Sequence, residues 1–414
     1  MGKVPIWHRN DLDDSFVSDD DGKKLHSFHN GVHKDKLLPR WDGAHLDPHI
    51  NLGITNAHYE YVYEAASKKG KKYYYPVLAY NNVPQEEQEE FYHIDPINLK
   101  HIRKGRAKIL IINTMEGWEH TWFFKFLIDY FIGAYNLNYS NFVILSGNMD
   151  ETDYGTPVVY YNWWEQHAIF SDIPKLYQDG WYNLRNLERQ HNFICLSRRP
   201  HCHRVALSSL IYNNKDKGIL TLAKHVDYGS TTVWENSLHK MSTVYPKIWK
   251  HPSTPKLLAD APLIFDDGLN AKDSNPTFDD APQKFYDSYL HVVLETFADG
   301  DQTFFSEKIF KPMLYFQPFI LSGAHNDLAK LRELGYKTFD GLIDESYDTI
   351  QDDELRLIAV AKEINRIAEM NKDEINAWYK DCYEILIHNF WHHIYRMNTI
   401  HIGLRKDLLE KLNV

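Results

Sequence analysis

The stretch that most constrains the fold runs from Leu290 to Gly323, where an apolar segment, a polar loop, an amphipathic segment and a second apolar segment follow one another. Leu290 to Leu294 is rich in Val and Leu, which predicts a buried strand. Ser306 stands where a helix N-cap would, ahead of an acidic and a basic residue. Phe319 to Leu321 predicts a second short strand. Strand, loop, helix and strand in this order are typical of an α/β domain.

The chemistry at the start of this predicted helix is typical of a nucleotide site. Free N–H groups at a helix start favour an anion, and Lys308 adds a positive charge for a phosphate. Glu295 and Glu307 can accept hydrogen bonds from ribose or sugar hydroxyls. Pro312 falls beyond the first turn, which predicts a kink or a late helix start. The alternative interpretation is an ordinary strand–loop–helix with a solvated Glu–Lys pair.

A second alternation of strands and helices precedes this stretch. We predict strands at Tyr73 to Tyr80, Lys108 to Asn113, Phe142 to Leu145 and Val158 to Tyr161, and an apolar helix at Trp122 to Tyr135. This alternation indicates a Rossmann-like lobe. It contains no GxGxxG, so the sequence does not indicate a dinucleotide cofactor.

An acidic residue, Glu116, lies three residues after the end of the KILIIN strand. Ligands in open α/β sheets lie at the carboxyl ends of the strands. Glu116 is therefore the predicted catalytic carboxylate, and Glu119 and Glu165 are the reserve candidates for a general base.

A cluster of arginines follows the strand predicted at His191 to Leu196. Arg198, Arg199 and Arg204 precede a helix predicted from Val205 to about Tyr212. Fixed positive charges at a strand end suit a pyrophosphate leaving group. An exposed basic turn is the alternative. The sequence does not decide which of Arg198 and Arg199 points inward.

Two features of the N-terminal region bear on metals and nucleic acid. Residues 1–60 form a polar, His-rich extension whose spacing matches no closed zinc pattern, so we expect no metal site. Residues 67–75 read SKKGKKYYY, where lysines beside aromatics suit a nucleic-acid contact. A solvated lysine turn before a strand is the alternative. The candidate contacts are Lys68, Lys69, Lys71 and Lys72.

Length, charge and cysteine usage narrow the class of protein. A chain of 414 residues favours two domains, and a net charge of −11 gives no global basic footprint for nucleic acid. Three cysteines give no disulfide framework, which fits a reducing cytoplasm. No apolar run reaches the ~20 residues of a membrane helix, and the N-terminus lacks a signal-peptide core. We expect a cytoplasmic protein without membrane insertion.

The stretch from Leu290 to Gly323 resembles the donor-binding motif of α1,3-fucosyltransferases and related two-lobed glycosyltransferases. In those enzymes a strand ending in Glu-Asn precedes a Thr/Ser-Glu-Lys helix start and a proline-containing strand. The matching residues are Glu295-Thr296, Ser306-Glu307-Lys308 and Pro318-Phe319-Ile320. Because this chain has Thr296 where those enzymes usually have Asn, we do not assign to Thr296 the contacts that the Asn makes in them.

The stretch is also similar to uncharacterised glycosyltransferase-like proteins of tailed phages and large viruses. Those proteins carry FxxEKIxKP, then PFI, then a Leu-Gly-Tyr/Phe-Lys-Thr-Phe run, which here is Leu334 to Phe339. The resemblance implies a GT-B fold, with two Rossmann-like lobes and a cleft between them. The implied parts are an extension at 1–60, an acceptor lobe at 61–188, a nucleotide-sugar donor lobe at 189–375 and C-terminal helices at 376–414 that cross back to the first lobe.

The implied activity is transfer of a sugar from a nucleoside diphosphate sugar, UDP-sugar favoured, to a hydroxyl acceptor. The resemblance implies an inverting, metal-independent reaction with no cofactor. The implied donor-binding residues are Arg198, Arg199, Arg204, Glu295, Thr296, Ser306, Glu307 and Lys308. A phage-type enzyme would act in the bacterial host cytoplasm on DNA, moving glucose or arabinose to hydroxymethylated bases such as hydroxymethylcytosine. The alternatives are a glycan, lipid or protein glycosyltransferase that uses a GDP-sugar, and a non-catalytic nucleotide-sugar-binding protein.

Overall fold

The computed structural model describes residues 4–6, 63–65, 72–79, 92, 94, 96–114, 120–149, 155–165, 188–224, 232–264, 285–298, 300 and 302–413. The chain divides into two compact units, Met1–His167 with Arg396–Val414 and Ala168–Tyr395. Each unit contains a parallel β-sheet with helices packed against it. The protein is therefore of the α/β class, as the sequence predicts.

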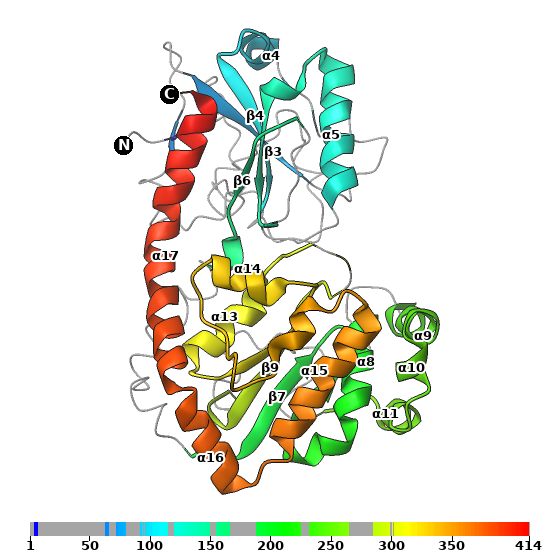
Figure 1. The fold of residues 1–414 in the computed structure, drawn as a ribbon. Helices are drawn as coiled ribbons and strands as arrows, with labels where there is room; N and C mark the ends of the chain where they lie inside the picture. Colours follow the sequence, from blue (N-terminus) through cyan, green and yellow to red (C-terminus); the bar gives the residue numbers. More distant parts are fainter. Residues whose placement is uncertain are drawn as a thin grey trace, which may run out of the picture. The chain divides into compact units, whose positions relative to one another are not determined.

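The first unit is built on a six-stranded parallel sheet in the order β2-β1-β3-β4-β5-β6 (Figure 1). Its strands are β1 (Val4–Ile6), β2 (Tyr63–Ala65), β3 (Tyr73–Leu78), β4 (Ala107–Asn113), β5 (Phe142–Ser146) and β6 (Val158–Tyr160). Its helices are α4 (Pro96–Arg103), α5 (His120–Tyr135), the short 3₁₀ helix η5 (Tyr139–Asn141) and the end of α17 (Tyr383–Leu412).

Helices cover both faces of this sheet, because apolar residues occupy both faces of its central strands. Ile109 and Ile111 of β4 pack in one core with Phe131 of α5. Leu110, on the opposite face of β4, packs in a second core with Leu408 of α17. Figure 1 shows α5 and α17 on opposite sides of the sheet. The predicted strands and the apolar helix of this region are confirmed to within two residues at each end.

Two strands of this sheet, β1 and β2, were not predicted. β1 pairs in parallel with β2 and, at Ile6, with Tyr74 of β3. Residues 1–60, which contain β1, were expected to form a polar extension, and no strand was predicted before Tyr73. A three-residue strand is too short to show a periodic pattern, so the sequence carries no signal for it.

The second unit holds a four-stranded parallel sheet in the order β10-β9-β7-β8. Its strands are β7 (His191–Ser197), β8 (Gly218–Leu222), β9 (Ser288–Leu294) and β10 (Phe319–Ser322). Its α-helices are α8 (Cys202–Ile211), α9 (Thr232–Val244), α10 (Pro246–Trp249), α11 (Thr254–Asp260), α13 (Glu307–Leu314), α14 (Asp327–Glu333), α15 (Asp353–Ala368), α16 (Lys372–Asp381) and the first part of α17. Its 3₁₀ helices are η7 (Tyr212–Lys217) and η8 (Glu345–Thr349). α15 packs against α8, β7 and β10, and α9, α10 and α11 pack on α8 (Figure 1).

The helix that follows β9 differs from its prediction at one point. α13 begins at Glu307, directly after Ser306, and continues through Pro312. The late helix start predicted from Pro312 is therefore wrong. Pro312 has no backbone N–H, so the helix loses the one hydrogen bond that this residue would donate. The helix ends two residues later, at Leu314. Phe316, at φ 51°, then turns the chain, and the N–H of Gln317 donates to the carbonyl of Pro312 at 2.9 Å.

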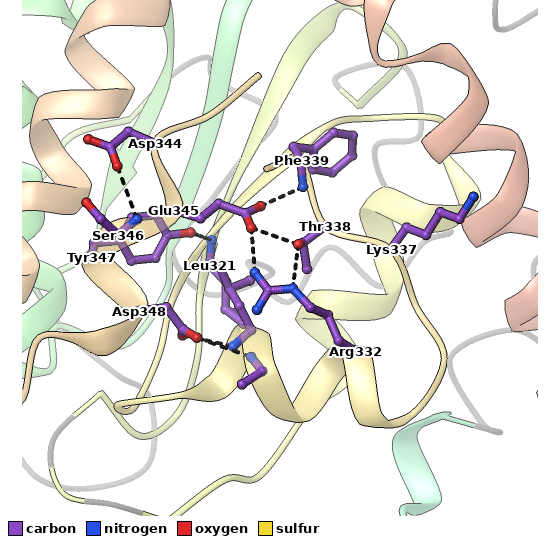
Figure 2. Close-up of polar contacts among 12 residues, drawn as sticks. Leu321, Arg332, Lys337, Thr338, Phe339, Asp344, Glu345, Ser346, Tyr347 and Asp348 are labelled. Carbon is purple, nitrogen blue, oxygen red and sulfur yellow. Dashed lines mark hydrogen bonds and ion pairs between the residues drawn. The ribbon is translucent and has the colours of Figure 1, made fainter. Parts of the chain in front are cut away.

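The Leu-Gly-Tyr-Lys-Thr-Phe run is organised by the buried carboxylate of Glu345 (Figure 2). This carboxylate accepts hydrogen bonds from Arg332 Nη2 at 2.6 Å, Thr338 Oγ1 at 2.7 Å and the backbone N–H of Phe339 at 2.5 Å. Burial raises the pKa of Glu345, and these donors act against that shift. The run is also held by Asn389 of α17, whose side-chain amide accepts from the N–H of Lys337 and donates to the carbonyl of Lys337, each at 2.8 Å.

Candidate anion-binding pocket of the second unit

A pocket opens in the second unit beside the carboxyl ends of β7 and β8, along β9 and the first turns of α13. The segment after α11 and Phe285 complete its lining. It encloses about 870 Å³ of open space, solvent in its mouth included.

The floor of the pocket is one face of the sheet. Leu196 of β7 pairs with Thr221 of β8, and Ile194 pairs with His291 of β9. Because side chains alternate along a strand, Leu196, Thr221 and His291 share a face. All three line the pocket. The floor therefore carries one apolar side chain, one hydroxyl and one imidazole.

The end of β9 and the start of α13 are joined by a hydrogen bond between side chains. Glu295 directly follows β9 and is buried, and its carboxylate accepts from Ser306 Oγ at 2.6 Å and from Ser306 N at 3.3 Å. Ser306 is the N-cap of α13 and accepts from the backbone N–H of Lys308 at 3.4 Å. The predicted N-cap is confirmed. Its pairing with Glu295 fixes where the helix begins.

The first turns of α13 carry three charged side chains into the pocket lining, Glu307, Lys308 and Lys311. The ammonium of Lys308 lies 2.8 Å from Ser306 Oγ and 3.2 Å from Glu307 Oε1. Burial acts to raise the pKa of Glu307, but the charges of Lys308 and Lys311 outweigh it and bring that pKa to about 2. Glu307 is therefore ionised and holds Lys308 in place. Burial raises the pKa of Glu295, against the charge of Lys308.

Arg204, in the first turn of α8, is the most deeply buried cation of the pocket, with 4% of its surface exposed. Its Nη2 donates to the backbone carbonyl of Glu295 at 3.0 Å, whereas its Nε has no hydrogen-bond partner among the described residues. Burial lowers the pKa of Arg204 to about 10 against the carboxylates of Glu295 and Glu307, so the side chain stays charged at neutral pH. A buried charged donor left unpaired is rare in proteins, and one that lines a pocket is suited to an anionic ligand.

The two arginines of the preceding loop are placed differently. Arg198 is partly buried and lines the pocket, whereas Arg199 is exposed and is outside the lining. His203 donates through Nε2 to the same carbonyl of Glu295 as Arg204, at 3.1 Å. Burial, with the nearby charge of Arg204, holds the pKa of His203 well below its usual range, so this imidazole is neutral.

Other predicted site residues lie elsewhere. Glu116 and Glu119 lie outside the described residues, as do Lys68, Lys69 and Lys71. Lys72 belongs to the first unit, where its ammonium lies 3.4 Å from the carbonyl of Asn413. Thr296 donates its backbone N–H to the carboxylate of Glu295 at 3.3 Å.

The reserve base Glu165 is fully buried in the first unit and forms a bidentate pair with Arg396 of α17. Arg396 Nη2 lies 2.8 Å from Glu165 Oε2, and Arg396 Nε contacts Oε1. Both carboxylate oxygens are thereby occupied, which gives Glu165 a structural role in anchoring α17.

Three residues of this region were missed by the sequence analysis. Lys311 lines the pocket one turn after Glu307, and the helical spacing of the two could have revealed it. His291 is the single histidine in an apolar strand. Arg189 is fully buried at the start of β7, and no pattern marks it.

Arg189 holds the far end of α13. Its Nη2 donates to the carbonyls of Tyr315 and Phe316 at 3.2 Å each and to Tyr379 OH at 3.0 Å. Its Nη1 donates to the carbonyls of Phe285, Tyr286 and Ser288. A cation at a helix C-terminus is favourable, so Arg189 stabilises α13 at the end opposite to the pocket.

No group of three or more His, Cys, Asp or Glu side chains that could hold a metal ion occurs in the described part of the chain. Among the helices that the structure describes, none combines the length and the apolar character needed to cross a membrane. Comparison with protein-family models, with curated proteins and with solved structures finds no match to this chain.

Proposed function

We propose that the protein is a glycosyltransferase of GT-B architecture that takes a nucleoside diphosphate sugar as donor and binds it in the pocket of the second unit. The observation that carries this proposal is Arg204, a buried arginine whose Nε lacks a partner among the described residues while the side chain lines the pocket. A ligand with phosphate oxygens would supply the missing acceptor.

The charges around Arg204 support a diphosphate rather than a neutral ligand. Arg198, Lys308 and Lys311 line the same pocket, so four cations face it together with the carboxylate of Glu307. Cleavage of the bond between sugar and diphosphate builds negative charge on the leaving group. Fixed cations in a partly dehydrated site stabilise that charge without reorganising during the reaction.

The link between Glu295, Ser306 and Lys308 supports the same function. Ser306 Oγ donates to Glu295 and accepts from the Lys308 ammonium, so the lysine is held at the start of α13 before any ligand binds. These are the residues of the motif that resembles the donor site of fucosyltransferases. Their preorganised geometry is what a donor site requires.

The acceptor is proposed to be a hydroxyl group, which Glu116 would deprotonate as it attacks the anomeric carbon with inversion. The C–O bond to the diphosphate breaks as the new glycosidic bond forms, and the diphosphate leaves with its electron pair. Hydroxymethylated bases of phage DNA are the proposed acceptor class, and a glycan, lipid or protein hydroxyl is the alternative.

Calorimetry with UDP, GDP and pyrophosphate in the presence of EDTA tests the donor site. We expect binding of all three without added metal, and a marked loss of affinity in Arg204→Gln. Lys256→Gln removes an exposed charge of the same unit and is the control. Absence of nucleotide and pyrophosphate binding by the wild-type protein would refute the proposal.

Labelled UDP- and GDP-sugars then separate an enzyme from a binding protein. Release of free sugar, or transfer to hydroxymethylcytosine DNA or to a glycan, is the expected result. Tight nucleotide binding without hydrolysis or transfer to any of these acceptors would instead support a non-catalytic nucleotide-sugar-binding protein.

A further inference from the structure

A chain of hydrogen bonds fixes the tautomer of His291. Gln317 Nε2 donates to the carbonyl of Ser288 at 2.9 Å, and that carbonyl also accepts from Arg189 Nη1 at 2.8 Å. Because a carbonyl can only accept, the Gln317 amide must turn its Oε1 toward His291 Nδ1, which lies 3.2 Å away. Nδ1 therefore carries the proton of the neutral imidazole, and Nε2 carries a lone pair.

This imidazole stays neutral over the working range of most proteins. Burial lowers the pKa of His291 to about 3, and the positive charge of Lys311 acts in the same direction. Only 5% of His291 is exposed, yet the residue lines the pocket, and none of the described residues forms a hydrogen bond with Nε2. The floor of the pocket thus offers a fixed acceptor that has no donor within the described protein.

The surroundings of His291 suit a flat, apolar ring. Phe285 stacks on the imidazole with centroids 5.4 Å apart and planes inclined by 20°, and Tyr315 stacks on Phe285 at 4.9 Å and 14°. Leu263 and Ile264 line the pocket as well. Apolar and aromatic walls with few polar groups are typical of sites for planar ligands such as nucleobases.

The distance along β9 fits one ligand that spans both ends of the pocket. His291 precedes Leu294 by three residues, and a strand rises by about 3.3 Å per residue, so roughly 10 Å separate them. Arg204 contacts the carbonyl of the next residue, Glu295. A nucleoside diphosphate with its phosphates at Arg204 would therefore place its base near His291.

We propose that Nε2 of His291 accepts a hydrogen bond from a ring N–H of the donor's nucleobase, so that the pocket selects bases whose ring carries such an N–H beside a carbonyl, as in uracil and guanine. This inference rests on the proposed function and adds the chemical class of the base. Cytosine and adenine present a ring nitrogen with a lone pair at the corresponding edge. That lone pair would face the lone pair of Nε2, which disfavours these bases.

Calorimetry with UDP, 3-methyl-UDP, CDP, ADP and pyrophosphate tests the inference. The wild-type protein should bind UDP roughly tenfold more tightly than 3-methyl-UDP, which lacks the ring N–H, because an unpaired Nε2 forfeits one hydrogen bond. It should also bind UDP more tightly than CDP or ADP. Pyrophosphate, which has no base, provides a reference for the phosphate end of the pocket.

The His291→Phe variant separates the hydrogen bond from the bulk of the added methyl group. In this variant UDP and 3-methyl-UDP should bind alike, because the acceptor for the ring N–H is gone. Pyrophosphate has no base and should bind as it does to the wild-type protein. The four UDP and 3-methyl-UDP affinities form a double-mutant cycle, which isolates the contact between Nε2 and the ring N–H. The wild-type comparison stands by itself if the variant does not fold. His291→Gln, which keeps an acceptor oxygen, should restore part of the preference for UDP.

The possible failures are distinguishable. Equal wild-type affinity for UDP and 3-methyl-UDP, or CDP and ADP binding as tightly as UDP, would overturn the assignment of His291 and leave the anion site intact. A preference for UDP that persists unchanged in His291→Phe would place the acceptor on another residue. Failure of the wild-type protein to bind both nucleotides and pyrophosphate would remove the proposed function together with this inference.

Discussion

The hydroxyl of Ser306 donates a 2.6 Å hydrogen bond to the carboxylate of Glu295, and this contact joins the end of β9 to the cap of α13. Strand end and helix start are separated by the loop of residues 296–305, yet they meet through two short side chains. The ammonium of Lys308 lies 2.8 Å from the same hydroxyl. One serine therefore sets the position of the helix and of a pocket cation.

Ser306→Ala should lower both stability and nucleotide affinity. The change removes an N-cap, which costs about 1 kcal/mol, and leaves a buried carboxylate with one donor fewer, which adds about 1 kcal/mol. Urea unfolding should show a loss of about 2 kcal/mol in the free energy of unfolding. Ser346→Ala, at an exposed serine, is the control. Equal stability of the two variants would show that the contact with Glu295 does not organise the helix start.

Lys308→Ala should weaken UDP binding by roughly 1.5–3 kcal/mol, the cost of a lost charge-assisted hydrogen bond. The change also removes the ion pair with Glu307, whose side chain is 20% exposed, so the unliganded protein should lose some stability as well. Titration calorimetry gives the affinity, and thermal unfolding without ligand checks the fold. Arg199→Ala should have a smaller effect, because Arg199 lies outside the pocket lining. Unchanged UDP affinity in Lys308→Ala would place the donor phosphates elsewhere.

Arg189→Met should destabilise the second unit by at least about 3 kcal/mol, because carbonyls in the interior would lose their donor. Arg366→Met is a matched change at a side chain that is 43% exposed, and it should cost less than about 1 kcal/mol. Urea unfolding compares the two variants. Similar losses in both would mean that the carbonyls around Arg189 find other donors.

The pH dependence of stability should reflect His291. Its pKa is about 3 in the folded protein against an ordinary value of 6.5. The unfolded chain therefore binds a proton that the folded chain does not, and the stability present above pH 6.5 is lost as pH falls toward 3. His291→Gln removes this term, so between about pH 7 and about pH 4.5 it should lose about 2 kcal/mol less than the wild-type protein. His239→Gln, at an exposed histidine, should follow the wild-type curve.

The sequence predicted the parts of the fold and site that have a local signature. The strand of β9 follows from its apolar run, and Ser306 follows from N-cap chemistry. Arg189 and His291 could not be assigned in this way, because their roles depend on carbonyls and an amide that the fold brings from distant segments. Which of Arg198 and Arg199 points into the pocket likewise depends on the path of the loop that carries them. Burial of a charged or titratable group is a tertiary property, and local patterns do not encode it.

Glu116→Gln should bind UDP as the wild-type protein does but lose turnover by about 10²–10⁴-fold, the usual contribution of a general base. The amide keeps the size of the side chain but cannot take the proton of the acceptor hydroxyl. Glu119→Gln, three residues further along the sequence, is the matched control, and the measurement is the rate of sugar transfer from UDP-sugar at saturating donor. Loss of turnover in Glu119→Gln instead would identify Glu119 as the general base.

If the acceptor is DNA, its affinity for the protein should fall steeply as the salt concentration increases, because lysines such as Lys72 would displace counterions from phosphates. An acceptor affinity that does not change with salt would favour a neutral glycan.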